Sequence, residues 1–303
     1  MKVEKDISLS EITAWKVGGK IEALITVDTL SELKSCISNL KASNTNYTVI
    51  GQTTNLLFTS KNINGVLIKL SGEFDSVIKS SESNLFIGAA CWVPKVARTA
   101  MKYSLSGIEH IVGIPGSFGG LIRMNGGSQR KSISESINYV LCLKDNFELV
   151  KLKVEDCSFS YRESIFKKSN LIILGAEISL KKRNKRQIRR EYLQILSSRR
   201  KKFPKNLPNC GSVFKSNPEF YKVVGTPGFA IEKVGLKGYS IGDAQVSDLH
   251  ANFIVNNGNA SSDDILNLIK LCEKEMETEF GFSLEPEVQY IDENCNLHEI
   301  KSL

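Results

Sequence analysis

The pattern of apolar and polar positions predicts strands and helices that alternate irregularly along the chain. Short apolar runs typical of buried strands occur at Tyr47–Ile50, Gly65–Leu70, Asn84–Gly88, Tyr139–Leu143, Glu148–Leu152, Leu171–Leu180, Asn252–Val255 and Glu287–Ile291. Helical spacing appears at Ser31–Leu40, which Thr29 or Ser31 opens, at Pro94–Lys102 and at Gly228–Val234. We expect a fold of the α+β class.

The longest helix with helical spacing is expected at Ser262–Phe280. Its apolar positions include Ile265, Leu268 and Ile269, spaced so that they share one face. Ser261 or Ser262 would cap its first turn, where acidic side chains favour the helix dipole.

Composition adds few constraints. The chain has 303 residues, long enough for more than one domain, and 41% of them are hydrophobic, an ordinary share for a globular protein. No apolar run approaches the roughly 20 residues that span a bilayer. The first residues lack the apolar core of a signal peptide. We therefore expect a cytoplasmic protein without membrane insertion.

The seven cysteines and three histidines are scattered. No C-x-x-C pair and no Cys/His grouping at zinc spacing occurs, so we expect no metal site. A reducing compartment favours free thiols over disulfides. Catalysis by Cys210 with His250 is a further idea that the sequence alone leaves open.

The net charge of +7 has a local origin. Residues 181–202 contain eleven basic residues and one acid and carry +10, so the rest of the chain carries −3. Such a stripe is either a solvated helix face or a site for phosphate or nucleic acid. Few aromatic residues accompany it, which disfavours stacking on bases. The change in composition there also marks the best candidate domain boundary.

Two glycine-bearing segments are candidates for a dinucleotide site. The first follows the strand Tyr47–Ile50 as Gly51-Gln52-Thr53-Thr54-Asn55-Leu56, where successive amides and hydroxyls would cradle phosphate. It fits neither the Rossmann fingerprint nor the P-loop. The second contains Gly113, Ile114, Pro115, Gly116, Gly119 and Gly120. Because ordering so many glycines costs entropy, such a run usually lets the backbone approach a ligand closely.

These segments resemble motifs of the UDP-N-acetylenolpyruvoylglucosamine reductase family, in the same order along nearly the whole chain. The opening Thr13–Gly19 is similar to N-T-F-x-x-G-G, Gly51–Leu57 to G-x-G-S-N-L-L, and Leu105–Gly120 to L-S-G-x-E-x-x-x-G-I-P-G-x-x-G-G. Later matches are Met124–Gly127, Phe159–Phe166, Gly211–Lys215, Gly235–Gly238, Ile241–Ser247, His250–Asn256 and Leu284–Val288. A single piece is weak evidence, whereas their shared order is specific.

The resemblance implies a vanillyl-alcohol-oxidase-like FAD-binding fold. It predicts two α+β FAD-binding subdomains, residues 1–70 and 71–182, and a C-terminal α+β substrate domain, residues 183–303. The two glycine segments and Asn125 would bind FAD without a covalent bond. The chain has no room between Arg162 and Ser212 for the tyrosine-bearing insert of the longer subtype, so it resembles the shorter subtype.

The same resemblance implies a two-stage reduction of an enolpyruvyl UDP-sugar in cell-wall synthesis. NADPH would deliver hydride to the flavin, which would pass it to the enolpyruvyl double bond. Arg162 would hold the substrate carboxylate, and a protonated Glu287 would stabilise the enolate-like charge. Ser212 would deliver the proton, backed by a relay through Lys215 or water.

Other contacts are implied less strongly. Tyr161, Lys215 and Gln245 are candidate substrate contacts, and Arg199 and Arg200 would meet the UDP pyrophosphate. Gln52 and Thr54 depart from the usual glycine and serine, Gln129–Lys131 from the usual Tyr-Gly, and Ser216 from the usual asparagine. These departures put local contacts in question.

Three alternatives to a monomeric reductase of this kind stay open at this stage. A related flavoprotein oxidase would share the flavin loops without needing Ser212 or Glu287. A basic nucleic-acid-binding module would bind no flavin and would depend strongly on salt. A cysteine enzyme would need Cys210.

Overall fold

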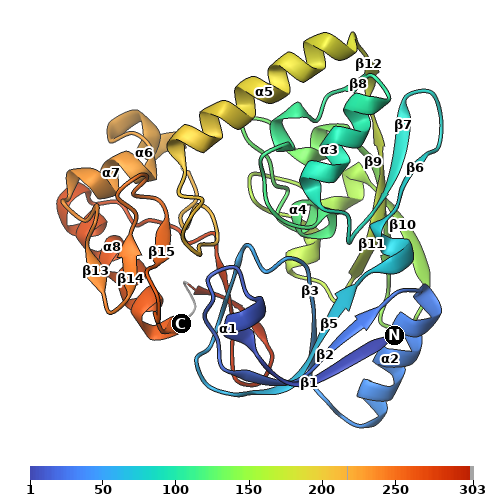
Figure 1. The fold of residues 1–303 in the computed structure, drawn as a ribbon, viewed down its shortest axis with the longest axis horizontal. Helices are drawn as coiled ribbons and strands as arrows, with labels where there is room; N and C mark the ends of the chain where they lie inside the picture. The colour runs from blue at the N-terminus through green and yellow to red at the C-terminus, as the bar shows by residue number, and fades with distance from the viewer. Residues whose placement is uncertain (217, 301–303) are drawn as a thin grey trace.

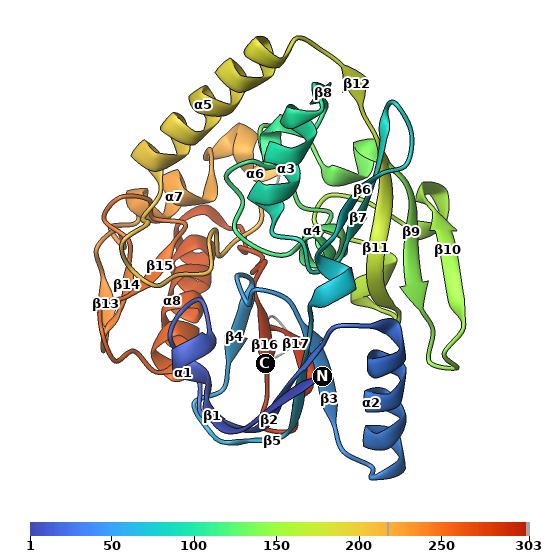
Figure 2. The ribbon, with the colours of Figure 1, turned by 45° about the vertical axis from the view of Figure 1, so that its right-hand side comes forward.

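The computed structural model describes residues 1–216 and 218–300. Two sheets and a C-terminal group of helices make up most of the molecule (Figures 1 and 2). No helix within these ranges is long and apolar enough to cross a membrane. Helices and strands are mixed throughout, so the predicted α+β class is confirmed.

The first sheet comes from the first 70 residues and has the order β1-β2-β5-β3. Its strands are β1 (Lys2–Ser8), β2 (Lys20–Val27), β5 (Ile63–Leu70) and β3 (Tyr47–Ile50). β1 is antiparallel to β2, whereas β2 and β3 run parallel to β5. The short α1 (Leu9–Ile12) follows β1, and α2 (Leu30–Ala42) buries Leu33, Cys36 and Ile37.

The second sheet is antiparallel throughout, in the order β10-β9-β11-β7-β6. Its strands are β6 (Val77–Lys79), β7 (Asn84–Gly88), β9 (Ile137–Leu143), β10 (Leu149–Lys153) and β11 (Ile172–Ser179). Packed with this sheet in one apolar core are α3 (Val93–Lys102) and α4 (Phe118–Arg123). A two-stranded ribbon joins β8 (Leu105–Ser106) to β12 (Lys181–Lys182).

The basic stripe forms α5 (Lys185–Lys202), which runs from the second sheet's side of the molecule to the C-terminal helices (Figure 1). Beyond it lie α6 (Pro218–Val223), α7 (Pro227–Lys233) and α8 (Ser262–Phe280). A small sheet of β13 (Ser240–Ile241), β14 (Ala244–Val246) and β15 (Ile254–Asn256) completes this part.

The last strands return to the first part of the chain. β16 (Gln289–Ile291) pairs with β17 (Leu297–Glu299) and, in parallel, with β4 (Leu56–Phe58), which directly follows the first glycine loop. Figure 2 shows these C-terminal strands beside β4. The predicted boundaries at 70 and 182 stay predictions, and this pairing adds a strand from the end of the chain to the N-terminal part.

Most predicted elements are present with bounds shifted by a few residues. The caps at Thr29 and Ser261 are confirmed, since their hydroxyls accept from the amides of Glu32 and Asp264. β1 and β2 were not predicted. β1 is mostly exposed and polar, so it lacks a clear pattern, whereas β2 alternates and carried a signal that was missed.

Trp15 ties the N-terminal segment to the C-terminal part. Its side chain is buried in the C-terminal core, and its indole N–H donates to the carbonyl of Ile254 in β15 at 2.8 Å. The side-chain amide of Asn256 donates in turn to the carbonyl of Trp15 at 2.9 Å. These bonds cross about the whole length of the chain.

We expect Trp15→Phe to lower the free energy of unfolding by about 1–3 kcal/mol, because the buried carbonyl of Ile254 loses its donor. Urea denaturation followed by circular dichroism measures the change. Trp92 is the other tryptophan and is 46% exposed, against 1% for Trp15. Trp92→Phe should therefore change stability by no more than about 0.5 kcal/mol. Equal losses in the two variants would contradict the proposed tie.

Candidate active site

A cavity of about 1210 Å³ opens where the two sheets and the C-terminal part meet. Both glycine segments line it, together with β11 residues, the end of α5 and the loop that precedes Ser212. Pockets for small ligands usually measure about 300–1,000 Å³. This cavity is therefore large enough for a cofactor and a second ligand together.

The first glycine loop offers a row of unpaired amides to this cavity. Thr53 has a positive φ of 57°, and its hydroxyl accepts from the amide of Ala14. The backbone N–H groups of residues 52–55 find no acceptor in the described part of the chain, although these residues line the cavity. Successive free amides around a left-handed residue form an anion-binding concavity. The loop thus fits a phosphate or pyrophosphate group.

The second glycine segment closes over the first. Thr54 donates its hydroxyl to the carbonyl of Pro115 at 3.2 Å. Gly116 is buried with a φ of 133°, which L side chains rarely adopt. A Cβ on Gly51 would lie 2.2 Å from the hydroxyl of Ser117, so these turns leave no room for side chains. The amides of Gly116 and Ser117 likewise have no acceptor within residues 1–216 and 218–300.

Arg162 stands at the tip of a two-residue hairpin. Ser160 and Glu163 exchange backbone hydrogen bonds of 3.2 Å, which forces Arg162 to a φ of 57°. A non-glycine residue in this region usually marks a conformation imposed by its surroundings. The guanidinium lines the cavity, donates to the carbonyl of Gly127 at 3.2 Å and lies across the Tyr161 ring.

Glu287 lies beside Arg162 and lines the same cavity. Arg162 Nε and Glu287 Oε1 are 2.9 Å apart, and both side chains are largely buried. Burial raises the pKa of Glu287, although the charge of Arg162 opposes this shift. Because burial favours its protonated form, a carboxyl group at this place beside a guanidinium is suited to donate a hydrogen bond to an anionic ligand.

Ser212 completes this group of three. It lines the cavity with Arg162 and Glu287, so the structure brings the three predicted catalytic residues to one wall. Neighbouring backbone bonds hold Ser212 beside Glu287: the amide of Glu287 donates to the carbonyl of Val213 at 2.7 Å. Of the predicted cofactor residues, all but Asn125 also line the cavity.

Four predicted residues do not line the cavity: Asn125, Tyr161, Lys215 and Gln245. The buried side chain of Asn125 donates to the carbonyl of Ser160 and accepts from the amide of Ser134, so it supports the Arg162 hairpin. Gln245 lies in β14 and donates to the carbonyl of Gly238. The ligand contacts of these four residues remain predictions, and the side-chain hydrogen bonds of Asn125 and Gln245 are to other parts of the protein.

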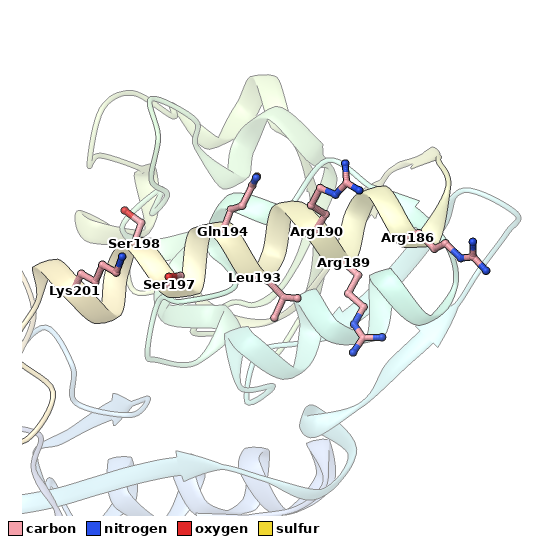
Figure 3. A pocket seen from close by; sticks show the side chains of 8 residues that line it. All are labelled: Arg186, Arg189, Arg190, Leu193, Gln194, Ser197, Ser198 and Lys201. Atoms are coloured by element: carbon pink, nitrogen blue, oxygen red, sulfur yellow. The ribbon is translucent and has the colours of Figure 1, made fainter.

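The basic side chains of α5 lie at two different places. Arg199 and Arg200 line the cavity near its C-terminus, and the side chain of Arg199 lies against Gly113. Burial lowers the pKa of Arg199, but a guanidinium stays charged at neutral pH. The other basic residues of its exposed face, Arg186, Arg189, Arg190 and Lys201, border a separate shallow depression (Figure 3).

Sequence reasoning missed several residues of the cavity wall. Ser117 lies inside the quoted glycine motif, and its hydroxyl caps α4 by accepting from the amide of Gly120. Arg123 and Lys205 add positive charge, and the backbone of Ile172 and Ile173 lines the cavity from β11. Ser117 was detectable from its position between glycines. The others become neighbours only through folding.

The cysteine alternative loses support. All seven cysteines are free and buried, and burial raises the pKa of the Cys210 thiol, which disfavours the nucleophilic thiolate. The His250 ring packs against Phe203 and Phe253. No group of ligating side chains among the described residues is suited to a metal ion.

The comparisons with known proteins decide the family. Residues 21–152 match an FAD binding domain, and residues 203–291 match the C-terminal domain of UDP-N-acetylenolpyruvoylglucosamine reductase. UDP-N-acetylenolpyruvoylglucosamine reductase 1 of Corynebacterium glutamicum is 40% identical over 287 residues, 94% of this chain and 85% of the relative. This chain belongs to the UDP-N-acetylenolpyruvoylglucosamine reductase family. It is an FAD-containing oxidoreductase, as its glycine motifs predicted.

Further members of the reductase family agree. The reductase of Caldanaerobacter subterraneus subsp. tengcongensis is 35% identical, with 93% of this chain and 91% of the relative covered. The crystal structure of the UDP-N-acetylenolpyruvylglucosamine reductase from Thermus caldophilus superposes with a TM-score of 0.80 at 31% identity, covering 96% of this chain and 99% of that one. The predicted FAD-binding fold is confirmed.

The free amides of the two glycine segments, and glycines whose surroundings leave no room for a side chain, suit a backbone-bound FAD of the kind expected in this family. We expect Gly51→Ala to weaken FAD binding by about 10- to 100-fold, because the new methyl group forces Ser117 out of place. Titration of the apoprotein with FAD, followed by flavin fluorescence, measures this affinity. Gly258→Ala serves as the control, because Gly258 does not line the cavity and its new methyl group would meet only the carboxylate of Asp243. Unchanged affinity in Gly51→Ala would remove this loop from the cofactor site.

Proposed function

We propose that the protein reduces UDP-N-acetylglucosamine enolpyruvate to UDP-N-acetylmuramate, with NADPH as hydride donor and non-covalently bound FAD. In this proposal it acts as a cytoplasmic monomer in the synthesis of peptidoglycan precursors and binds neither nucleic acid nor membrane. The observation that carries the proposal is the shared cavity wall of Arg162, Ser212 and Glu287 beside the glycine loops. Membership of the reductase family supports the same reaction.

The three side chains match the needs of an enolpyruvyl reduction. FAD, when bound, supplies the means of passing hydride from NADPH to the terminal carbon of the double bond. Arg162 holds the substrate carboxylate with two parallel hydrogen bonds, an arrangement that lysine does not reproduce. Glu287, its pKa raised by burial, donates a hydrogen bond to the charge that accumulates on that carboxylate.

Ser212 delivers the proton to the neighbouring carbon. A hydroxyl is a weak acid, so the proton must be replaced from a second donor. Lys215 does not fill this role, because its ammonium is held by Glu163 and Glu285 at 2.9 and 2.6 Å and does not line the cavity. We therefore assign the relay to water.

The UDP pyrophosphate is assigned to the C-terminal end of α5. Arg199, Arg200 and Lys205 line one region of the cavity and carry the positive charge that a diphosphate requires. The exposed face of α5 lies on a separate depression and takes no part in this contact.

An anaerobic two-step experiment tests the function. The purified protein should show flavin absorption bands, NADPH should bleach them, and the enolpyruvyl UDP-sugar should restore them with formation of the muramate product. In a parallel aerobic assay a flavoprotein oxidase would instead be reduced by its own substrate and reoxidised rapidly by oxygen, with peroxide formed and no NADPH consumed. That outcome, or failure of the enolpyruvyl sugar to restore the bands, would overturn the proposal.

In the same experiment Ser212→Ala separates the two steps. Bleaching by NADPH should proceed at the wild-type rate, because Ser212 takes no part in that transfer. Restoration by the enolpyruvyl sugar should slow by about 10²–10⁴-fold, the usual contribution of a general acid. Normal turnover in this variant would remove Ser212 from the mechanism.

Arg200→Gln tests the pyrophosphate site. Because Arg200 is exposed, we expect the KM for the UDP-sugar to rise only about fivefold at low salt, and less as ionic strength increases. Arg186→Gln is the matched control, since Arg186 lies on the same helix but outside the cavity. An equal effect of both variants would show that α5 attracts the substrate only through its overall charge.

A further inference from the structure

A chain of ion pairs lies behind the wall that carries the three proposed catalytic residues. Lys215 contacts Glu285 at 2.6 Å and Glu163 at 2.9 Å, and the same Glu163 oxygen contacts Lys167 at 2.6 Å. Lys167 continues to Glu299 at 2.9 Å. The lysine side chains are the buried members, 8% exposed for Lys215 and 4% for Lys167.

Each partner of Lys215 belongs to a different catalytic segment. Glu163 directly follows Arg162 and closes its hairpin, Glu285 lies two residues before Glu287, and Lys215 itself lies three residues after Ser212. Three distant parts of the chain therefore meet at one ammonium group.

Within residues 1–216 and 218–300, backbone bonds join two of these segments directly. The amide of Lys215 donates to the carbonyl of Glu285 at 2.8 Å, and the amide of Glu287 donates to Val213 at 2.7 Å. The Arg162 hairpin reaches the Ser212 segment through side chains: the Lys215–Glu163 pair and the Tyr161 hydroxyl, which accepts from the amide of Ser216 at 3.1 Å. Besides the Arg162–Glu287 pair within the wall, the Lys215–Glu163 pair is thus a second charged link, which joins the hairpin to the Ser212 segment from behind.

The two glutamates compensate the charge of Lys215, which favours a fixed arrangement of the three side chains. Burial opposes the charge of Lys215, yet Glu285 and Glu163 outweigh this effect and raise its pKa. An ammonium group with a raised pKa gives up its proton poorly and stays charged, so its ion pairs persist. Removing one partner of a buried pair leaves an uncompensated charge, so the arrangement resists loosening.

We propose that Lys215 is a positioning residue, which holds the segments of Arg162, Ser212 and Glu287 in register through Glu163 and Glu285. The inference rests on the proposed function and assigns Lys215 a role behind the wall in place of the substrate contact or proton relay expected from sequence. A displacement of about 1 Å in such a group lowers a rate by about 10²-fold.

Lys215→Met tests this role in the FAD-loaded protein. Reduction by NADPH should stay within about twofold of wild type, while reoxidation by the enolpyruvyl UDP-sugar should slow by about 10²-fold. Lys237→Met is the matched control, because Lys237 forms a 2.8 Å pair with Glu232 in the same C-terminal part. It should leave both steps unchanged.

The pH profile of reoxidation separates positioning from simple loss of stability. Arg162, Lys215 and Lys167 are the cations that face Glu287, and each lowers its pKa against the effect of burial. If the protonated Glu287 is the active form, the rate falls as pH rises through that pKa. Without the Lys215 charge the pKa rises, so the alkaline limb of Lys215→Met should move to higher pH.

Two results would overturn the inference. One is an unchanged rate of reoxidation in folded Lys215→Met. The other is a parallel loss of both steps with no movement of the alkaline limb, which a merely destabilised protein would show. A wild-type protein that the enolpyruvyl sugar fails to reoxidise would instead overturn the proposed function, so the two failures are distinguishable.

If Lys215→Met does not fold, Glu285→Gln tests the same link. Glu285 is about half exposed, so its substitution is tolerated more easily, and the amide oxygen still accepts a hydrogen bond. Reoxidation by the enolpyruvyl sugar should slow severalfold with reduction by NADPH unchanged. Equal rates for wild type and Glu285→Gln would overturn the inference.

Discussion

The parallel pairing of β16 with β4 is the constraint on which the site depends. The amide of Gln289 donates to the carbonyl of Asn55 at 3.1 Å, and the side chain of Asn55 donates to the carbonyl of Glu287 at 3.0 Å. One residue of the first glycine loop therefore binds the backbone at Glu287 and again at Gln289, two residues further on. One of these bonds joins backbone to backbone and the other comes from the Asn55 side chain, and together they leave little freedom in the distance between the first glycine loop and Glu287.

The charges of the site follow from this enclosed geometry. Glu287 has Arg162 at 2.9 Å and Lys215 and Lys167 behind it, yet burial still raises its pKa. Two opposing influences of this kind leave a carboxyl group responsive to the charge of a bound ligand. An anionic substrate that takes Arg162 as its partner would remove part of the opposition and favour the protonated form of Glu287.

In the proposed function the glycine loops and α5 bind phosphate groups at two different places. The loops present amides with no acceptor within the described ranges, which suits a pyrophosphate held by the backbone. The end of α5 presents guanidinium groups instead. Ile188, Tyr192 and Ile195 bury the opposite face of α5, so the helix carries its arginines on a fixed support.

Local pattern in the sequence determined much of this protein. Apolar spacing and the Ser261 cap located α8 to the residue, Ser262–Phe280, and the ordered glycine motifs indicated the FAD-binding fold and the reductase family. The motifs also named Arg162, Ser212 and Glu287, which share one cavity wall. The helix, its cap and the motifs each depend on residues that are close together in the sequence, so they can be recognised without the tertiary structure.

Tertiary structure alone decided the rest. Lys215 follows Ser212 by three residues and was expected to face the substrate, but it turns to two glutamates that lie 52 and 70 residues away in sequence. The pairing of β16 with β4 and the placement of Arg123 and Lys205 on the cavity wall are equally non-local. The partner of a side chain depends on which distant backbone segments pack together. The spacing of residues within one segment carries no information about that packing.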